Sequence, residues 1–164
     1  MSEISVLFVC LGNICRSPTA HGVFETMVLQ AGLQDRIHID SCGTGDWHIG
    51  HSPDERSAST ALMRGYDLSH LRSRQIHSGD FQRFDYILVM DNKNLSDVKA
   101  LCPADYAGQI ELLLNYANNY SSTVEVPDPY YGGASGFDHV IDLVEDASQT
   151  LLNTLQASLI NTQT

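Results

Sequence analysis

The spacing of apolar residues predicts four strands. Residues 4–9 and 84–90 are largely apolar and rich in β-branched or aromatic side chains, the pattern of strands that are buried on both faces of a parallel sheet. Shorter apolar runs predict two more strands at 37–41 and 110–114. The first strand ends directly before Cys10.

Apolar residues three and four positions apart predict four helices between and after these strands. The predicted helices cover residues 18–31, 53–64, 91–101 and 135–155. Ser17 and Pro18 are typical of an N-cap and a first helical position, and Gly32 and Gly65 are typical of the residues that follow a helix. The last helix is long and amphipathic, so we expect it to cover one face of the sheet.

Strands and helices that alternate in this way predict an α/β fold. The expected architecture is an open, doubly wound parallel sheet of four strands with helices on both faces, of the flavodoxin-like or Rossmann-like type. A chain of 164 residues with 43% hydrophobic residues is long enough for one core, so we expect a single domain over 1–164.

The composition excludes several classes of partner. Nine Lys and Arg stand against 20 Asp and Glu, a net charge of −11 that disfavours nucleic acid and anionic membranes as ligands. The first residues carry no basic segment and the apolar run is too short for a signal core, so we expect a cytoplasmic protein. The four cysteines lack the spacing of a zinc site, and we expect free thiols, no metal and no cofactor.

The segment that follows the first strand, CLGNICRSP, has the pattern of an anion-binding loop. In an open α/β sheet, ligands bind at the carboxyl ends of the strands, which is where Cys10 falls. The segment leads into a helix N-terminus, and Gly12 and Asn13 tolerate the left-handed backbone that turns successive amides inward. We therefore predict that backbone N–H groups converge on a small volume above Cys10.

Cys10 and Arg16 give this loop a chemical function. The inward amides stabilise a thiolate, which makes Cys10 a nucleophile at neutral pH. The planar guanidinium of Arg16 can bind two oxygens of one phosphate. A thiolate below a tetrahedral oxyanion predicts in-line phosphoryl transfer through a phosphocysteine.

A phenolate leaving group also needs an acid, and the segment 115–134 offers one. This segment is long and aperiodic, which is typical of a functional loop. Asp128 lies between two prolines that stiffen the backbone, and Tyr130 and Tyr131 follow it. We predict that Asp128 is the general acid and that the tyrosines flank an aromatic substrate.

Together these segments resemble the low-molecular-weight protein tyrosine phosphatases, a family with CLGNICRS near the N-terminus and DPYYG late in the chain. The resemblance extends over essentially the whole length, including DSCGTGDWHIG and FDYILVMD. It implies a phosphotyrosine and aryl phosphate hydrolase in which Cys10 is the nucleophile, Arg16 binds the phosphate, and Asp128 protonates the leaving group and later activates water. The implied substrates are proteins that carry phosphotyrosine, and a cognate tyrosine kinase is an implied partner. We expect the protein to be a monomer or a weak dimer.

The resemblance also assigns supporting roles. The phosphate-binding loop would comprise Leu11, Gly12, Asn13, Ile14, Cys15 and Ser17. The hydroxyl of Ser17 would bond the Cys10 sulfur, and Asn13, Ser41 and His70 would join a network that holds the loop. The pocket walls would be Trp47, His48, Tyr130 and Tyr131. From the residues alone, we reach Asn13, Trp47 and the tyrosines, whereas without the resemblance His70 reads better as a surface or core histidine and Ser41 as a plain strand end.

Cys15 has two interpretations. The family resemblance implies that it pairs with Cys10 under oxidant, and chemically a neighbouring thiol can capture a sulfenic acid. A small buried side chain is an equally good interpretation of Cys15. Cys42 and Cys102 read as ordinary thiols.

Two other functions fit parts of the pattern. An arsenate reductase uses a similar loop but needs additional nearby cysteines, and Cys42 and Cys102 are not closely spaced. A phosphotyrosine-binding module without catalysis needs neither Cys10 nor Asp128. A nucleotide-binding loop is disfavoured because the chain has no glycine-lysine-serine or -threonine motif.

Overall fold

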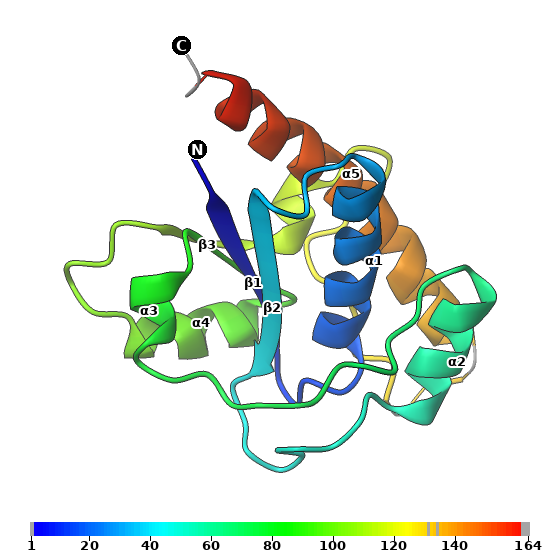
Figure 1. Cartoon of the computed structure of the whole chain (residues 1–164). Coiled ribbons are helices and arrows are strands. Elements are labelled where there is room, and N and C mark those ends of the chain that lie inside the picture. The colour runs from blue at the N-terminus through cyan, green and yellow to red at the C-terminus, as the bar shows by residue number, and fades with distance from the viewer. Residues whose placement is uncertain (1, 131, 134, 162–164) are drawn as a thin grey trace.

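The structure is a computed structural model that describes residues 2–130, 132–133 and 135–161. Its sheet has four parallel strands in the order β2-β1-β3-β4. The strands are β1 (Ile4–Cys10), β2 (Ile37–Gly43), β3 (Tyr86–Val89) and β4 (Gln109–Leu112). β1 pairs with both β2 and β3, so Cys10 ends an interior strand (Figure 1). The predicted parallel sheet is confirmed.

Helices cover both faces of the sheet, as the sequence predicted (Figure 1). They are α1 (Arg16–Gln30), α2 (Glu55–Met63), α3 (Asp80–Arg83), α4 (Asn92–Leu101) and α5 (Ser135–Asn161). α1 packs with α5 on one face, α3 and α4 lie on the other, and α2 packs beside α1 and α5. Not one helix in the described part of the chain combines the length and apolar character needed to cross a membrane.

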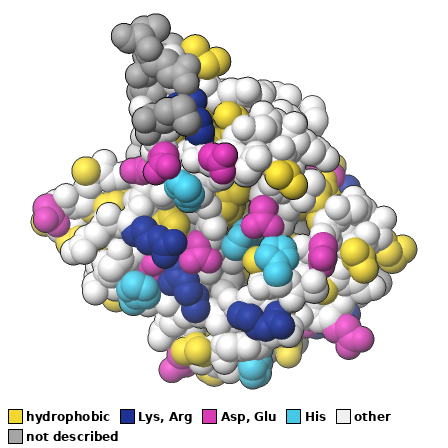
Figure 2. Space-filling view, viewed as in Figure 1, with side chains coloured by type: hydrophobic (Ala, Val, Ile, Leu, Met, Phe, Trp, Pro, Cys, Tyr) yellow, Lys and Arg dark blue, Asp and Glu magenta, His cyan; other side chains and the backbone are white. Residues whose placement is uncertain are grey.

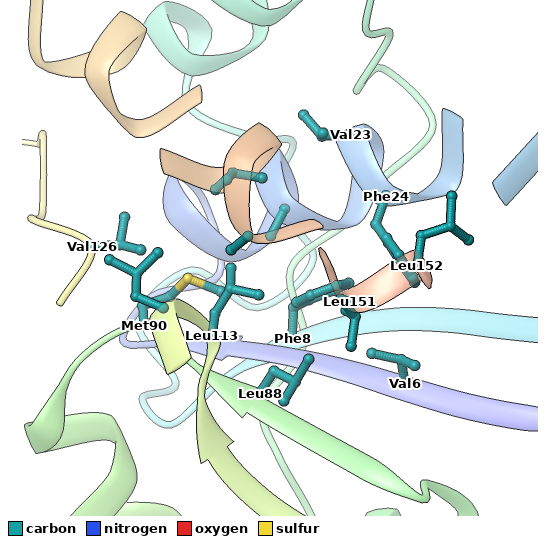
Figure 3. Close-up of a cluster of buried hydrophobic side chains, with 14 of the residues drawn as sticks. Val6, Phe8, Val23, Phe24, Leu88, Met90, Leu113, Val126, Leu151 and Leu152 are labelled. Carbon is teal, nitrogen blue, oxygen red and sulfur yellow. The ribbon is translucent and has the colours of Figure 1, made fainter. Parts of the chain in front are cut away.

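The alternation of side chains along β1 divides the core into two clusters. Val6 and Phe8 point toward α1 and α5, whereas Leu7 and Val9 point toward α3 and α4. The larger cluster joins Phe8 and Phe24, whose rings meet edge to face with centroids 5.8 Å apart. Figure 3 shows this cluster between the sheet and the two helices. β1 is therefore held rigidly up to Cys10.

The structure differs from the sequence-based elements at a few positions. The four-residue helix α3 is too short for its periodicity to be recognised in the sequence. Residues Leu113–Tyr116 form a 3-10 helix, so the last strand ends at Leu112. α1 begins at Arg16 and not after Ser17, because the Ser17 hydroxyl is turned into the loop and does not cap the helix. These differences leave the topology unchanged.

Candidate active site

A pocket of about 380 Å³ opens at the carboxyl end of the sheet. Its lining residues are Cys10, Leu11, Gly12, Ile14, Cys15, Arg16, Trp47, His48, Asp128 and Tyr130. They come from the loop between β1 and α1, the segment after β2, and the segment before α5. The structure therefore brings most of the sequence-predicted site residues to one cavity.

Five carbonyl groups of the loop over residues 10–15 accept hydrogen bonds from residues outside the pocket lining. The acceptor–donor pairs are Cys10 O with Thr44 N, Leu11 O with Gly45 N, Gly12 O with Ser73 Oγ, Ile14 O with Asp54 N, and Cys15 O with Thr19 N. Because the C=O and the following N–H of a trans peptide point in opposite directions, carbonyls bonded outward leave amides facing inward. The predicted cradle of N–H groups follows from these bonds.

Asn13 closes the cradle over the sulfur. Its φ of 56° is in the left-handed region that asparagine tolerates, and its N–H donates to Cys10 Sγ at 3.3 Å. Its side-chain Nδ2 donates to Ser17 Oγ at 2.7 Å, and its Oδ1 accepts from the N–H of Arg74 at 3.1 Å. Asn13 therefore fixes the loop through both its backbone and its side chain.

Gly43 permits a close approach between β2 and the loop. A Cβ at this position would lie 2.6 Å from the carbonyl oxygen of Leu11 and 3.2 Å from the N atom of Asn13. Both are backbone atoms, which cannot move aside without displacing the loop. No side chain fits here, so glycine is required by packing and not by its own φ.

Ser17 lies directly beside the Cys10 sulfur. Its Oγ is 3.0 Å from Cys10 Sγ and 3.3 Å from the carbonyl oxygen of Cys42. Because the Asn13 amide already donates to this oxygen, the Ser17 hydrogen is left to point at the sulfur or at the carbonyl. This geometry suits a hydroxyl that stabilises a thiolate.

The guanidinium of Arg16 is hydrogen-bonded to two groups that the sequence did not predict, the Asp91 carboxylate and the Val126 carbonyl. Arg16 is only 3% exposed, and its Nη1 bonds Asp91 Oδ2 at 2.7 Å and the carbonyl oxygen of Val126 at 3.0 Å. Burial alone would lower the pKa of Arg16, but the nearby Cys10 sulfur and the Asp91 carboxylate raise it overall. The signal that could have identified Asp91 is its position directly after the apolar run 84–90.

Asp128 lies at the mouth of the pocket with its side chain 42% exposed. Its Oδ2 is 3.8 Å from Arg16 Nη2, and its Oδ1 accepts from the N–H of Tyr130 at 3.1 Å. A carboxyl here faces the guanidinium across the opening and is accessible to solvent. That position suits a group that exchanges a proton with a leaving group or with solvent.

The supporting network differs from the one that the resemblance implied. Ser41 Oγ pairs with Nδ1 of the buried His21 at 3.0 Å. His70 is on the surface, where its Nε2 bonds Glu25 Oε1 at 2.8 Å, so it reaches Ser41 only by way of Glu25 and His21. The pKa of Glu25 is lowered, chiefly by its hydrogen bond to His21. His21 is the histidine that contacts Ser41, and His70 is linked to it through Glu25.

Aromatic and apolar side chains form the upper walls. Trp47 is 67% exposed at the rim, and His48 packs against Gly12, where a Cβ would be 3.0 Å from the His48 ring. The ring of Tyr130 lies under the guanidinium of Arg56, with 5.2 Å between the guanidinium carbon and the ring centroid. Tyr131 lies outside the described residues.

The cysteines of the loop have different surroundings. Cys15 packs against Ile14 and Phe137, and burial raises the pKa of Cys15 to about 12, so it is a neutral thiol at physiological pH. Burial also raises the pKa of Cys42 and Cys102, and all four cysteines are unpaired. Among the described residues, no three or more His, Cys, Asp or Glu side chains are grouped so as to hold a metal ion.

Comparison with known proteins identifies the family. A model of the low molecular weight phosphotyrosine protein phosphatases matches residues 5–161. The Schizosaccharomyces pombe protein of that name is 46% identical over 93% of this chain and 97% of its own. A protein tyrosine phosphatase structure from Entamoeba histolytica superposes with a TM-score of 0.91 at 40% identity, covering 95% of this chain and 99% of that one.

Another solved structure is informative about the type of substrate. A Drosophila protein described as an arginine phosphatase superposes with a TM-score of 0.84 at 31% identity, covering 92% of this chain and 96% of its own. The same scaffold therefore occurs in a protein named for a substrate other than phosphotyrosine. With the family match over nearly the whole chain, the conclusion is that this protein belongs to the low molecular weight phosphotyrosine protein phosphatase family.

Proposed function

We propose that the protein hydrolyses phosphotyrosine and small aryl phosphate monoesters through a phosphocysteine intermediate. The observation that carries this proposal is the juxtaposition of Cys10, Arg16 and Asp128 around one pocket. The sulfur is at the floor, the guanidinium is beside it, and the carboxyl is at the mouth. A phosphoryl group seated between them has an attacking group on one side and a proton donor on the other.

In the first step, the Cys10 thiolate attacks the phosphorus and an S–P bond forms. The P–O bond to the phenol breaks, and Asp128 in its acid form gives its proton to the departing oxygen. The inward amides and the Arg16 guanidinium stabilise the equatorial phosphoryl oxygens, where the transition-state charge lies. Asp91 fixes the orientation of the Arg16 guanidinium by accepting a hydrogen bond from Nη1.

In the second step, the same carboxyl acts as a base. Asp128, now a carboxylate, takes a proton from water, and the water oxygen attacks phosphorus. The S–P bond breaks, inorganic phosphate is released, and the Cys10 thiolate is restored. Ser17 Oγ, 3.0 Å from the sulfur, stabilises the thiolate as it leaves.

The walls of the pocket favour an aromatic group. Leu11, Ile14 and Tyr130 present apolar or aromatic surface above the cradle. A phenyl ring fills such a slot without losing hydrogen bonds, whereas a guanidinium would leave N–H donors against the apolar Ile14 side chain. A phosphoserine is too short to place its phosphorus at the sulfur while its peptide stays at the rim.

Phosphate release from matched substrates tests this function. We expect turnover of a phosphotyrosine peptide and of p-nitrophenyl phosphate without added thiol, and much slower turnover of the same peptide with phosphoserine and of free phosphoarginine. Preferred turnover of phosphoarginine would overturn the substrate assignment. Thiol-dependent arsenate reduction, or phosphopeptide binding with no phosphate release, would favour one of the other two functions.

We also propose the setting in which the protein works. Four unpaired cysteines, one of them at the reaction centre, suit a reducing compartment such as the cytoplasm. The net charge of −11 makes nucleic acid and anionic membranes poor partners. Phosphotyrosine proteins are the expected substrates, together with a cognate tyrosine kinase, and we expect a monomer or weak dimer. Gel filtration over a range of concentrations tests the oligomeric state.

Cys15 is proposed as a protecting thiol. Peroxide would convert the Cys10 thiolate to a sulfenic acid, and Cys15 sulfur would then displace water to form a disulfide that thiols can reduce. Support comes from the position of both cysteines in one loop, where Cys15 is a neutral thiol that does not compete for the substrate.

A further inference from the structure

One peptide unit in the phosphate-binding loop faces the sulfur directly. The N–H of Asn13 donates to Cys10 Sγ at 3.3 Å, and the carbonyl of Gly12, on the other side of the same peptide, accepts from Ser73 Oγ at 3.0 Å. Because the two groups of a trans peptide are antiparallel, holding the carbonyl outward holds the N–H inward. Rotation of this peptide would turn a carbonyl oxygen toward the Cys10 sulfur, in place of an N–H donor.

This peptide has little intrinsic preference for its orientation. It joins a glycine, which has the widest choice of backbone angles, to a residue at a φ of 56°. The carbonyls of Cys10, Leu11 and Ile14 accept from backbone N–H groups, which every residue except proline supplies. The Gly12 carbonyl instead accepts from a serine hydroxyl 61 positions away in the sequence.

The segment that carries Ser73 is itself well anchored. Ser73 N donates to the carbonyl oxygen of His51 at 2.9 Å, and the carbonyl of Arg74 accepts from Gly43 N at 2.8 Å. The Arg74 guanidinium bonds both oxygens of the buried Asp80, at 3.0 and 3.1 Å. Its Nη2 is also 3.0 Å from Asp40 Oδ2. Figure 2 shows several basic side chains next to acidic ones on one face of the molecule.

The geometry points to a positioning role for Ser73: we propose that its hydroxyl fixes the Gly12–Asn13 peptide so that the Asn13 N–H faces the Cys10 sulfur and the phosphate. This inference rests on the proposed function, because it concerns the same nucleophile. Ser73 does not touch the substrate. It acts through the loop, and its neighbour Arg74 supports the same residue by donating to the Asn13 side chain.

The test compares Ser73→Ala with Thr26→Val. Thr26 Oγ1 donates to the carbonyl oxygen of Gly22 at 3.0 Å within α1, so its loss removes a hydroxyl-to-carbonyl bond of the same length away from the loop. Alkylation of Cys10 by iodoacetate is followed by mass spectrometry across a range of pH, with and without inorganic phosphate. Thermal unfolding of each variant checks that the fold is retained.

In Ser73→Ala we expect Cys10 to need a higher pH for half-maximal alkylation, and inorganic phosphate to protect it about five- to tenfold less well, the effect of losing one hydrogen bond. kcat/KM for p-nitrophenyl phosphate should fall by a similar factor. Thr26→Val should match the wild type in all three measurements. Ser73→Thr, which keeps the hydroxyl, should recover part of the loss.

The test distinguishes a failure of the proposed function from a failure of the role proposed for Ser73. A wild-type Cys10 that reacts like an ordinary thiol contradicts the proposed function itself. A reactive wild-type Cys10 combined with an unchanged pH profile and unchanged phosphate protection in Ser73→Ala overturns the role of Ser73 alone. Equal changes in Ser73→Ala and Thr26→Val would also overturn it, because they would show a general loss of stability.

Discussion

The two sides of the pocket are built differently. The phosphate-binding loop is buried at Asn13, Arg16 and Ser17, and its carbonyls are bonded to segments from several parts of the chain. The acid loop over residues 126–130 leaves Asp128 exposed and is attached at its start, where Val126 N donates to the carbonyl oxygen of Met90 at 2.8 Å. One side is fixed and the other is open.

This difference corresponds to the two tasks. Binding a dianion in a protein of net charge −11 requires dipoles that are oriented before the substrate arrives. Proton transfer by Asp128 instead requires contact with the leaving group and then with water, which an exposed side chain has. Substitutions on the first side should therefore damage binding and attack, and substitutions on the second side should damage proton transfer.

The largest effect is expected for the nucleophile. Cys10→Ser should reduce turnover to background, because a serine hydroxyl is not ionised in this cradle, while the fold and some phosphate binding remain. Phosphate release and phosphate-dependent thermal stabilisation are the measurements. Cys102→Ser, which follows α4 away from the pocket, is the matched control. Substantial activity in Cys10→Ser would refute the assignment.

Asp128→Ala should have the next largest effect. We expect a loss of about 10²–10⁴ in rate on phenyl phosphate, and a smaller loss on p-nitrophenyl phosphate, whose leaving group needs less protonation. Phosphate affinity should change little. Asp97→Ala, which removes a carboxylate paired with Lys93 on α4, is the control. A small and equal loss on both substrates would remove Asp128 from this role.

The support of the acid loop should have a moderate effect. The Arg56 guanidinium carbon lies 5.2 Å from the Tyr130 ring centroid and 4.8 Å from that of Phe137, so it links α2 to the acid loop and α5. Arg56→Ala should lower kcat on phenyl phosphate about two- to fivefold with little change in phosphate affinity. Arg83→Ala removes a similar contact to Phe84, at 5.1 Å, and should change neither. Weaker phosphate binding in Arg56→Ala would contradict the division between the two sides.

Cys15→Ser should have the smallest effect on the turnover rate, but it should clearly reduce the recovery of activity after oxidation. After peroxide treatment, a thiol reductant should restore less activity to Cys15→Ser than to the wild type, since Cys10 would proceed to irreversible oxidation states. Activity before and after reduction is measured in parallel with Cys102→Ser. Equal recovery in all three proteins would end the proposed redox role.

The sequence predicted the features that depend on adjacent residues and missed the contacts between residues far apart in the chain. The buried run before Cys10 and the glycine and asparagine turn were sufficient to predict the strand and the cradle, because adjacent residues determine both. The contacts that Ser73 and Asp91 make with the loop could not be found in this way, since they span 61 and 75 positions, although the place of Asp91 directly after an apolar run was a sequence signal for that residue.

Ser17 and His70 show two further limits of the sequence. Ser17 has the residue type of a helix cap, but its hydroxyl contacts the Cys10 sulfur and the Asn13 side-chain amide and does not bond the backbone N–H groups of α1. The sequence offers no signal for a contact between His21 and Ser41, which only the packing of α1 on β2 brings together, while His70 reaches them through Glu25. Side-chain partners of this kind depend on tertiary packing.

In the proposed mechanism, Cys10 is a thiolate that lies below an incoming dianion, while Cys15 in the same loop remains a neutral thiol. Site-resolved alkylation by iodoacetate across pH in the wild-type protein tests it most directly. We expect Cys10 to react below neutral pH, inorganic phosphate to protect it, and Cys15 to stay unmodified over the same range. A Cys10 that reacts only under the alkaline conditions of an ordinary cysteine, with or without phosphate, would contradict it.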